Sequence, residues 1–156
     1  MRNSFLFLIF IVFFYGCSNK IPTLNERKDL AFSIINDKDI IQKNIETGSF
    51  NLFSFQKISN ECKTNIKIYV EGDGLSWISK SIISSNPTPI NPIALKLMLL
   101  DNNSCKIYLA RPCQYITSNG CEERYWTSHR FNTKIIESYE HVLNNLKKNI
   151  QILNLI

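Results

Sequence analysis

The sequence predicts an α/β fold with a largely parallel sheet. From residue 49 onward, strand-like apolar runs alternate with helix-like segments, which is the order typical of parallel strands joined by crossover helices. The final run, Ile150–Ile156, carries Ile or Leu on both of its faces, as a strand buried on both sides does. A Gly-rich segment, Glu71–Gly74, directly follows one of the strand-like runs.

The N-terminal residues have the composition of an export signal. A positive start at Arg2 is followed by an apolar run, Phe5–Phe14, that is much shorter than the roughly 20 apolar residues needed to span a bilayer. We expect residues 1–16 to be a cleaved signal peptide. The alternative is an uncleaved N-terminal anchor.

Gly16 and Cys17 resemble the lipobox of bacterial lipoproteins, in which the cysteine thiol receives a diacylglycerol and becomes the new N-terminus. The lipobox normally has Leu three residues before the cysteine, where this chain has Phe14. The resemblance implies lipidation of Cys17, a tether over residues 17–25, and attachment to a membrane of the bacterial cell envelope. Otherwise, Cys17 merely ends the apolar run.

Length and charge restrict the remaining possibilities. Removal of residues 1–16 leaves 140 of the 156 residues, the length of one ordinary domain, which we place at residues 26–156. The formal net charge is +5, but most of the positive side chains are Lys scattered among Asn and Ile. A nucleic-acid binder concentrates them on one face with aromatic residues between them. We therefore expect no nucleic-acid partner. No cofactor is expected either.

Four cysteines follow Cys17, namely Cys62, Cys105, Cys113 and Cys121. An exported chain can oxidise them. Cys113 and Cys121 flank a polar loop and are expected to form a disulfide. A zinc site is the alternative, but the chain has no C-x-x-C pair, so no metal is expected. Cys62 and Cys105 either pair with each other or stay as buried thiols.

Three elements are expected before the Gly-rich segment. Apolar residues at helical spacing predict a helix over Glu26–Ile45, which Gly48 stops. Ser49–Ile58 alternates apolar and polar residues, which predicts a strand with one solvated face and a bulge near Leu52. Ile66–Val70 predicts a second strand.

A helix and a strand are expected next. Asn91 is expected to cap a helix that has Pro92 in its first position and runs to about Asp101. Lys106–Ala110 is a continuous apolar run that predicts a buried strand.

The last two elements complete the expected sheet. Asn132 is expected to cap a helix over Thr133–Asn149. The chain then continues into the strand Ile150–Ile156, which we expect to lie parallel to its neighbours.

Three runs, and the order in which they occur, are similar to those of a known family. They are Ile68–Gly74 with Trp77, the Pro-Thr-Pro block followed by Ala94-Leu95, and Ile107–Tyr115, and the pattern continues in Cys121, Trp126 and Arg130-Phe131. The chain resembles the α/β-hydrolase fold over about Gly48–Ile156, specifically a group of exported bacterial lipoprotein hydrolases. The resemblance implies a partial α/β-hydrolase sheet with an antiparallel first strand, then parallel strands with crossover helices, truncated at the central strand.

In a hydrolase of this family the strand at Ile156 would lead into the nucleophile elbow, G-x-S-x-G, and the acid and histidine would follow later. The resemblance therefore implies that the complete catalytic triad lies beyond this sequence. The loop after the second predicted strand has the position of an oxyanion-hole loop, which makes Gly72, Asp73 and Gly74 its candidate residues. Members with an HGGG-type loop have His in place of Glu71. The alternative is a Gly-rich turn with no chemical role.

Other residues have structural explanations. Ser76 belongs to a Gly-x-Ser sequence, but Ile78 would crowd an elbow turn there. His129 is expected in a solvated loop and His141 on a helix surface, and neither has an acid partner by sequence. The two tryptophans either line an apolar substrate pocket or, as is more common, pack structurally. Residues 122–124 are expected to be a charged, solvated stretch of loop.

We therefore expect a truncated α/β-hydrolase-like lipoprotein of esterase or lipase ancestry, inactive alone or completed by a second chain that carries the catalytic residues. Its substrate would then be an ester-type small molecule or a lipid. The alternative is a non-catalytic envelope lipoprotein that acts as a binding or structural module. Because the strand Ile150–Ile156 would have an exposed edge, the mature chain alone is expected to be poorly soluble or oligomeric.

Overall fold

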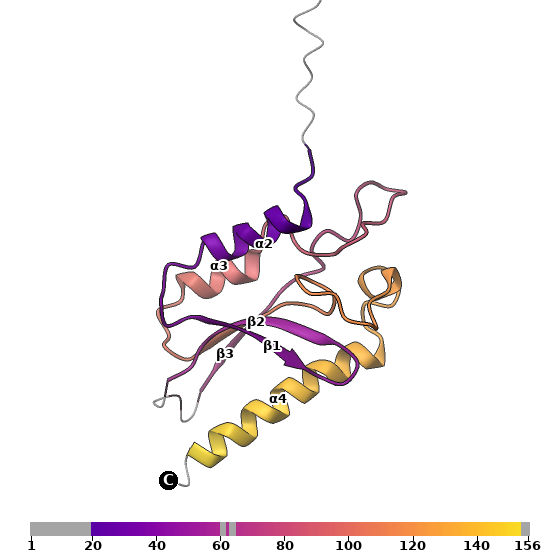
Figure 1. Ribbon diagram of the computed structural model, residues 1–156. Helices are drawn as coiled ribbons and strands as arrows, with labels where there is room; N and C mark the ends of the chain where they lie inside the picture. Colours follow the sequence, from indigo (N-terminus) through magenta and orange to yellow (C-terminus); the bar gives the residue numbers. More distant parts are fainter. Residues whose placement is uncertain (1–19, 60–61, 63–64, 154–156) are drawn as a thin grey trace, which may run out of the picture.

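The computed structural model describes residues 20–59, 62 and 65–153, and Figure 1 shows how their elements are arranged. The predicted signal peptide and Cys17 lie outside these residues. The elements are, in chain order, α2 (Leu24–Ser33), β1 (Ile41–Glu46), β2 (Asn51–Lys57), β3 (Lys67–Val70), α3 (Ile93–Leu100), β4 (Lys106–Leu109), the short 3₁₀ helix η1 (Glu123–Trp126) and α4 (Thr133–Leu153).

Four strands form one mixed sheet in the order β1-β2-β4-β3. β1 and β2 make an antiparallel hairpin, β2 is antiparallel to β4, and β3 is parallel to β4. α3 is the crossover between the two parallel strands. The predicted α/β class is confirmed, but within the described residues the sheet is mixed rather than largely parallel.

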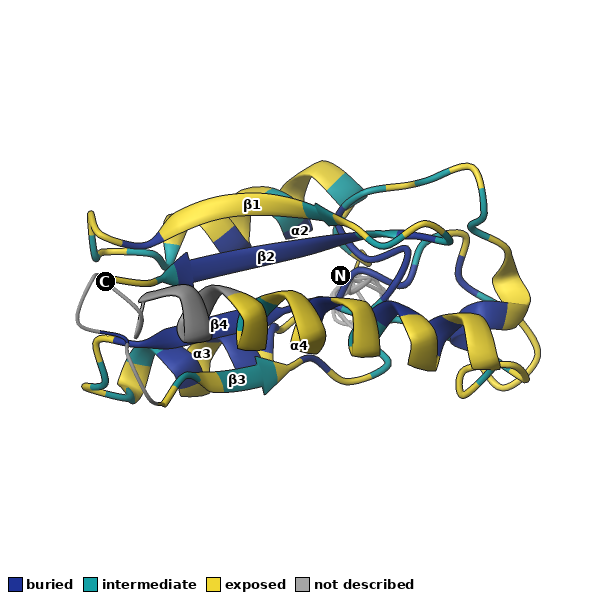
Figure 2. Cartoon of the chain, turned by 90° about the horizontal axis from the view of Figure 1, so that it is seen from below, coloured by how far each residue is buried: buried dark blue, intermediate teal, exposed yellow. Residues whose placement is uncertain are grey.

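Helices cover both faces of the sheet. α2 and α3 lie on one face and α4 lies on the other (Figure 1). Figure 2 shows β2 and β4 buried between β1 and β3, which are exposed or partly exposed. All four residues of β4 are buried, as expected of a strand covered on both faces.

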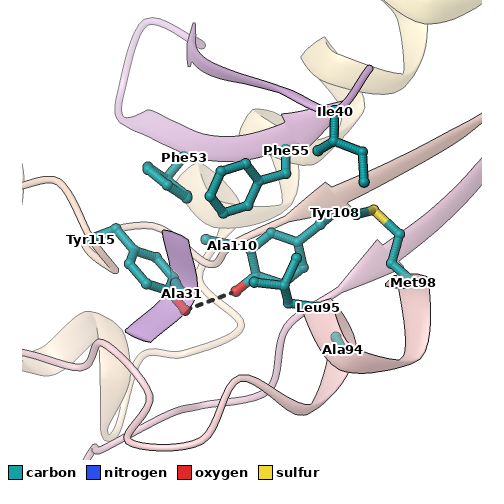
Figure 3. Close-up of a cluster of buried hydrophobic side chains, with 10 residues drawn as sticks. All are labelled: Ala31, Ile40, Phe53, Phe55, Ala94, Leu95, Met98, Tyr108, Ala110 and Tyr115. Atoms are coloured by element: carbon teal, nitrogen blue, oxygen red, sulfur yellow. Dashed lines mark hydrogen bonds between the residues drawn. The ribbon is translucent and has the colours of Figure 1, made fainter. Parts of the chain in front are cut away.

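Successive residues of β2 enter different cores. Phe53 and Phe55 point to the α2 and α3 side, where Phe53 stacks on Tyr115 at a ring-centroid distance of 4.6 Å and meets Phe55 edge to face at 5.0 Å (Figure 3). Leu52 joins the second cluster, together with Val142 of α4. Each such side chain contributes about 1.5–3 kcal/mol by burial, so β2 ties the two layers together.

The predicted helix over Glu26–Ile45 is wrong in its second half. α2 ends at Ser33, and Ile41 and Ile45 belong to β1 instead. A turn intervenes, in which the backbone N–H of Ile40 donates to the carbonyl of Asp37. The Asn-Asp pair that ends the helix is a turn signal, and β-branched Ile residues favour strands, so local chemistry outweighs the helical spacing.

The predicted strand Ser49–Ile58 is confirmed as β2, but two of its expected features are wrong. Its pairing with β1 runs unbroken from Glu46↔Asn51 to Ile41↔Gln56, so there is no bulge near Leu52. Its five central residues are all buried, so it has no solvated face. The sequence pattern reflects two apolar layers rather than one.

The next elements agree with the sequence apart from their ends. β3 and β4 form close to their predicted bounds, and α3 begins at Ile93 with Pro92 as its capping residue. The predicted Asn91 cap is therefore wrong by one position. The side chain of Asn91 accepts a hydrogen bond from Lys96 Nζ at 2.5 Å instead.

The predicted strand Ile150–Ile156 is wrong, because α4 continues as a helix to Leu153, and residues 154–156 lie outside the described part. The Asn132 cap is confirmed, since its side chain accepts from the backbone N–H of Lys134 at 3.0 Å. No Gly or Pro occurs within α4 to stop the helix. The exposed strand edge from which we expected poor solubility is therefore not formed at Ile150.

Both cysteine pairs form disulfides. Cys113 pairs with Cys121, as predicted, with their Cα atoms 5.6 Å apart. Cys62 pairs with Cys105 at a Cα distance of 5.5 Å, which decides between the two states that the sequence left open. The second disulfide joins the segment before β3 to the residue that precedes β4, and so fastens the start of the parallel pair.

The two disulfides are expected to differ in their contribution to stability. They close loops with sequence separations of 43 and 8 residues. By chain entropy, Cys62→Ala with Cys105→Ala should lower the free energy of unfolding by about 4 kcal/mol, and Cys113→Ala with Cys121→Ala by about 2.5 kcal/mol. Urea unfolding of the two double variants measures this. Equal losses would contradict the entropic account.

Asp101 links the end of α3 to β3. Its Oδ2 accepts from Lys67 Nζ at 2.8 Å and from the Tyr69 hydroxyl at 2.5 Å, and its Oδ1 accepts from the backbone N–H of Asn103 at 2.9 Å. The hydrogen bond from Lys67, followed by those from Tyr69 and Asn103, holds the pKa of Asp101 well below its usual range.

A depressed carboxyl pKa predicts a pH dependence of unfolding. The stabilisation is present above the unfolded-state pKa, about 3.9, and is lost as the pH falls toward the lower folded-state pKa. Asp101→Asn should therefore destabilise the protein at neutral pH and flatten the loss of stability below about pH 4. Urea unfolding at a series of pH values tests this, with Asp29→Asn on the exposed side of α2 as the control. A profile parallel to that of the parent chain would refute it.

Candidate functional site

The carboxyl ends of the parallel strands β3 and β4 meet at one edge of the sheet, where open α/β sheets bind ligands. An open groove of about 530 Å³ lies there, beside the Gly-rich loop that follows β3. Its lining residues are Val70, Glu71, Gly72, Gly74, Leu75, Pro89, Ile90, Asn91, Ile93, Ala94 and Leu97. Apart from Glu71 and Asn91 they are apolar, so the groove suits an apolar ligand.

The buried Glu71 ties the Gly-rich loop to α3 and to the core. Its Oε1 accepts from the backbone N–H groups of Gly72 at 3.0 Å and of Ala94, in the first turn of α3, at 3.4 Å. Its Oε2 accepts from the Tyr108 hydroxyl at 3.2 Å. Burial raises the pKa of Tyr108 far above its usual range, so the hydroxyl remains a donor. Glu71 is therefore a structural anchor of the loop.

Asp73 joins three loops through two arginines. Its Oδ1 lies 2.7 Å from Arg111 Nη1, and its Oδ2 lies 2.8 Å from Arg130 Nη1. Arg111 also donates to the carbonyl of Arg130, and both guanidinium groups lie over the ring of Phe131. The side chain of Arg111 is only 14% exposed, so water competes little for this pair. We call these four residues the Asp73 clamp.

Gln114 holds the loop from the β4 side. Its Nε2 donates to the carbonyl of Gly72 at 2.8 Å, and its Oε1 accepts from the backbone N–H of Arg111 at 3.0 Å. Its neighbours Cys113 and Tyr115 have φ angles of 71° and 63°, which non-glycine residues rarely adopt. The disulfide holds the first, and a hydrogen bond from the backbone N–H of Tyr115 to Thr88 Oγ1 holds the second. This backbone conformation directs the side chain of Gln114 towards the carbonyl of Gly72.

Of the three predicted oxyanion-hole residues, Gly72 and Gly74 line the groove and Asp73 lies between them in the loop, but the three are not equivalent. The backbone N–H of Gly72 is occupied by Glu71, whereas those of Asp73 and Gly74 donate to no other described residue. An oxyanion hole requires such free backbone donors. Of the three candidates, Asp73 and Gly74 therefore meet this requirement.

The structure brings none of the other candidate residues into the groove. The Ser76 hydroxyl donates to the carbonyl of Asp73 at 3.0 Å. His129 is exposed, and its Nδ1 lies 2.8 Å from the hydroxyl of Ser128. His141 is exposed on α4. Within the described residues, no serine is joined to both a histidine and a carboxylate, as an activated nucleophile would be.

The tryptophans do not line the groove. Trp126 is 7% exposed, packs in the core cluster on the α4 side, and donates through Nε1 to the carbonyl of Ser84 at 3.0 Å. Trp77 is 48% exposed. The expected charged stretch at 122–124 is solvated, with an exposed ion pair between Arg124 and Glu122 at 2.7 Å.

Neither a metal-ligand group among the described residues nor a known relative identifies the function of this site. The part of the chain that is described contains no group of three or more His, Cys, Asp or Glu side chains that could hold a metal ion. In comparisons with known proteins, no family model, no curated protein and no solved structure matches the chain. The groove and the Gly-rich loop beside it therefore provide the basis for a proposed function.

The Asp73 clamp is the part of the site that sequence reasoning missed. One indication of the pair between Asp73 and Arg111 was present in the sequence. Asp73 follows β3 and Arg111 follows β4, and the carboxyl ends of neighbouring parallel strands meet at one edge of the sheet. Arg130 gave no such signal. It reaches Asp73 from a loop 57 residues further along the chain.

The two glycines of the loop are expected to respond differently to substitution. A Cβ at Gly74, which has a φ of +65°, would lie 2.0 Å from the carbonyl oxygen of Pro87, whereas a Cβ at Gly72 would meet no atom within 4 Å. Gly74→Ala should cost more than about 3 kcal/mol of stability, and Gly72→Ala less than about 1 kcal/mol. Urea unfolding of both variants tests this, and similar losses would show that the loop is not built as described.

Proposed function

We propose that this chain forms the N-terminal half of an α/β-hydrolase-type ester hydrolase, whose site is completed by a serine, an acid and a histidine from a further polypeptide segment. The observation that carries the proposal is the Gly-rich loop after β3, with two free backbone N–H groups beside an apolar groove. In serine hydrolases of the α/β type, one oxyanion donor comes from the loop that follows the third strand. The Gly-rich loop of this chain likewise follows its third strand, which supports the proposal.

The groove favours an ester with an apolar acyl group. Leu75, Ile90, Ile93 and Leu97 line it, and the last two are 52% and 53% exposed. An acyl chain that covers these side chains would gain about 25 cal/mol for each Å² removed from water. The polar carbonyl would then lie near the loop rather than among the apolar side chains.

The arrangement of the sheet supports the same fold. An antiparallel hairpin is followed by a parallel pair with a crossover helix, as the resemblance implies. The backbone N–H groups of Lys67 and Glu71 face β4, where they donate to the carbonyls of Cys105 and Leu109. Strand alternation therefore turns the backbone groups of Ile68 and Val70 outward. A further strand can pair with β3 at this edge.

Such a strand would complete the site if it ran parallel to β3. Its carboxyl end would then reach the edge of the sheet that carries the Gly-rich loop, which is where a nucleophile elbow exposes its serine. The serine oxygen would attack the ester carbonyl as a histidine takes its proton, and the alcohol would leave with a proton from that histidine. Water would then hydrolyse the acyl-enzyme. The N–H groups of Asp73 and Gly74 would stabilise the oxyanion in both steps.

A second candidate is a non-catalytic envelope lipoprotein that binds an apolar ligand. The observation that favours it is that the described residues lining the groove include no serine, cysteine or histidine. The groove could then hold an acyl chain without any reaction.

The location outside the cytoplasm has support of its own. Two disulfides fit an oxidising, exported environment. No helix in the described part of the chain is both long and apolar enough to cross a membrane. In this proposal a lipid on Cys17 attaches the chain to the envelope membrane.

Ester hydrolysis by the mature chain, with and without the product of the adjacent downstream reading frame, tests the proposal. With a short-chain chromogenic ester we expect activity only when both chains are present. Gly72→Ala, which adds a methyl group to a residue that lines the groove, should lower kcat/KM of the mixture by about 10–100-fold, and Asp29→Asn on α2 should not change it. Activity of this chain alone would place a nucleophile within it, and inactivity of both preparations would favour the binding function.

A further inference from the structure

The segment Ser76–Ser84 forms a small hairpin that projects from the body at the upper right of Figure 1. The backbone N–H of Ile78 donates to the carbonyl of Ile82 at 2.8 Å, and that of Ser84 donates to the carbonyl of Ser76 at 3.0 Å. Trp77 and Ile83 are paired as an isolated antiparallel bridge. The hairpin is therefore an ordered structure with Lys80 at its tip.

The hairpin exposes large apolar side chains. Trp77, Ile78 and Ile82 are 48%, 46% and 54% exposed, while Ile83 packs against the core cluster beneath. Lys80 is the single charged residue of residues 75–85. An exposed apolar patch that projects from a protein surface marks an interaction site. A tryptophan, two isoleucines and a lysine are the side chains that favour the boundary between a bilayer and water.

Arg27 fixes the base of the hairpin to α2. This residue is 5% exposed, and its guanidinium donates to the carbonyls of Asn86 and Thr88, and through Nε to that of Thr23. The hydroxyl of Ser84 donates to the same carbonyl of Asn86 at 2.8 Å. The start of α2 and the base of the hairpin are therefore one connected unit, and both lie on the upper side of Figure 1.

The length of the tether brings this unit close to a membrane, if Cys17 carries a lipid as proposed above. Thr23 lies six positions after Cys17, with five residues between them, so even a fully extended tether spans only about 20 Å. The hairpin extends about 13 Å from Ser76 to Lys80 if its strand is extended. The tip of the hairpin can therefore reach the surface to which the lipid holds the chain.

We propose that the Ser76–Ser84 hairpin inserts its tip into the lipid interface of the envelope membrane, as a second contact beside the lipid on Cys17. Trp77, Ile78 and Ile82 enter the boundary of the acyl chains, and Lys80 binds anionic head groups. Two contacts, unlike a single flexible tether, fix the orientation of the body. The Gly-rich loop directly precedes the hairpin, so the groove is held beside the membrane, where apolar esters are concentrated.

The two tryptophans of the chain provide the test, because one lies on the hairpin and the other in the core. The full chain is reconstituted into vesicles of phosphatidylethanolamine and phosphatidylglycerol that contain lipids brominated near the head group. In the Trp126→Phe variant, the emission of Trp77 should shift to the blue and lose at least about half of its intensity. In the matched Trp77→Phe variant, the buried Trp126 should lose little.

A further variant keeps both tryptophans and so avoids the loss of the Trp126 hydrogen bond. Ile82→Asp should abolish the blue shift and the quenching while the chain stays on the vesicles. Quenching of Trp126 to the same extent as Trp77 would overturn the proposal, as would a vesicle-bound Trp77 that remains open to aqueous quenchers. The latter result would indicate that a protein, rather than a membrane, covers the apolar side chains of the hairpin.

Labelling of the chain with palmitate, with Cys17→Ser as the control, separates this inference from the anchor on which it rests. A labelled, vesicle-bound chain with an unquenched Trp77 would overturn the hairpin contact alone. An unlabelled chain with a quenched Trp77 would overturn the lipid anchor and support the hairpin contact. A chain that is neither labelled nor retained on vesicles would overturn both.

Discussion

The burial of β4 on both faces is the constraint on which the rest of the structure depends. Ile107, Tyr108 and Leu109 are at most 1% exposed; Tyr108 packs in the cluster that includes residues of α3, and Leu109 in the cluster that includes residues of α4. Because β4 cannot shift without opening one of the two cores, its carboxyl end has a defined position relative to β3. That position brings Arg111 to Asp73 and Gln114 to Gly72. The site is therefore a consequence of how the central strand is packed.

The sequence predicts the elements whose signals are local and misses those that tertiary contacts decide. The buried run at β4 and the Pro-containing start of α3 are strong local signals, and both are found. Ile41 and Ile45 fit a helical spacing as well as a strand, and only the pairing with β2 makes them β1. The C-terminal apolar run fits a buried strand as well as a helix, which is an ambiguity that periodicity alone cannot resolve.

The candidate site was predictable in its position but not in its geometry. A Gly-rich segment after a strand identified the loop, since the carboxyl ends of parallel strands are where α/β folds place ligands. The sequence could not show that Glu71 occupies the N–H of Gly72, because this requires the first turn of α3 to lie against the same carboxylate. It also could not show the clamp, since Arg130 arrives from a distant loop. Contacts between loops depend on the packed body, which spacing does not encode.

The two proposed functions differ in the role that they assign to the unpaired edge of β3. The hydrolase needs a further strand to pair with it, whereas the binding module does not. An unpaired edge invites aggregation, and proteins protect such edges by keeping them short and by placing lysine on them. β3 has four residues and carries Lys67, which binds Asp101. Its edge is therefore protected against indiscriminate pairing, which is compatible with a module that acts alone. The chemistry of the loop argues the other way, because free N–H groups beside an apolar groove have no evident use in a simple binding module. A partner strand would have to provide enough apolar surface of its own to pair with so short an edge.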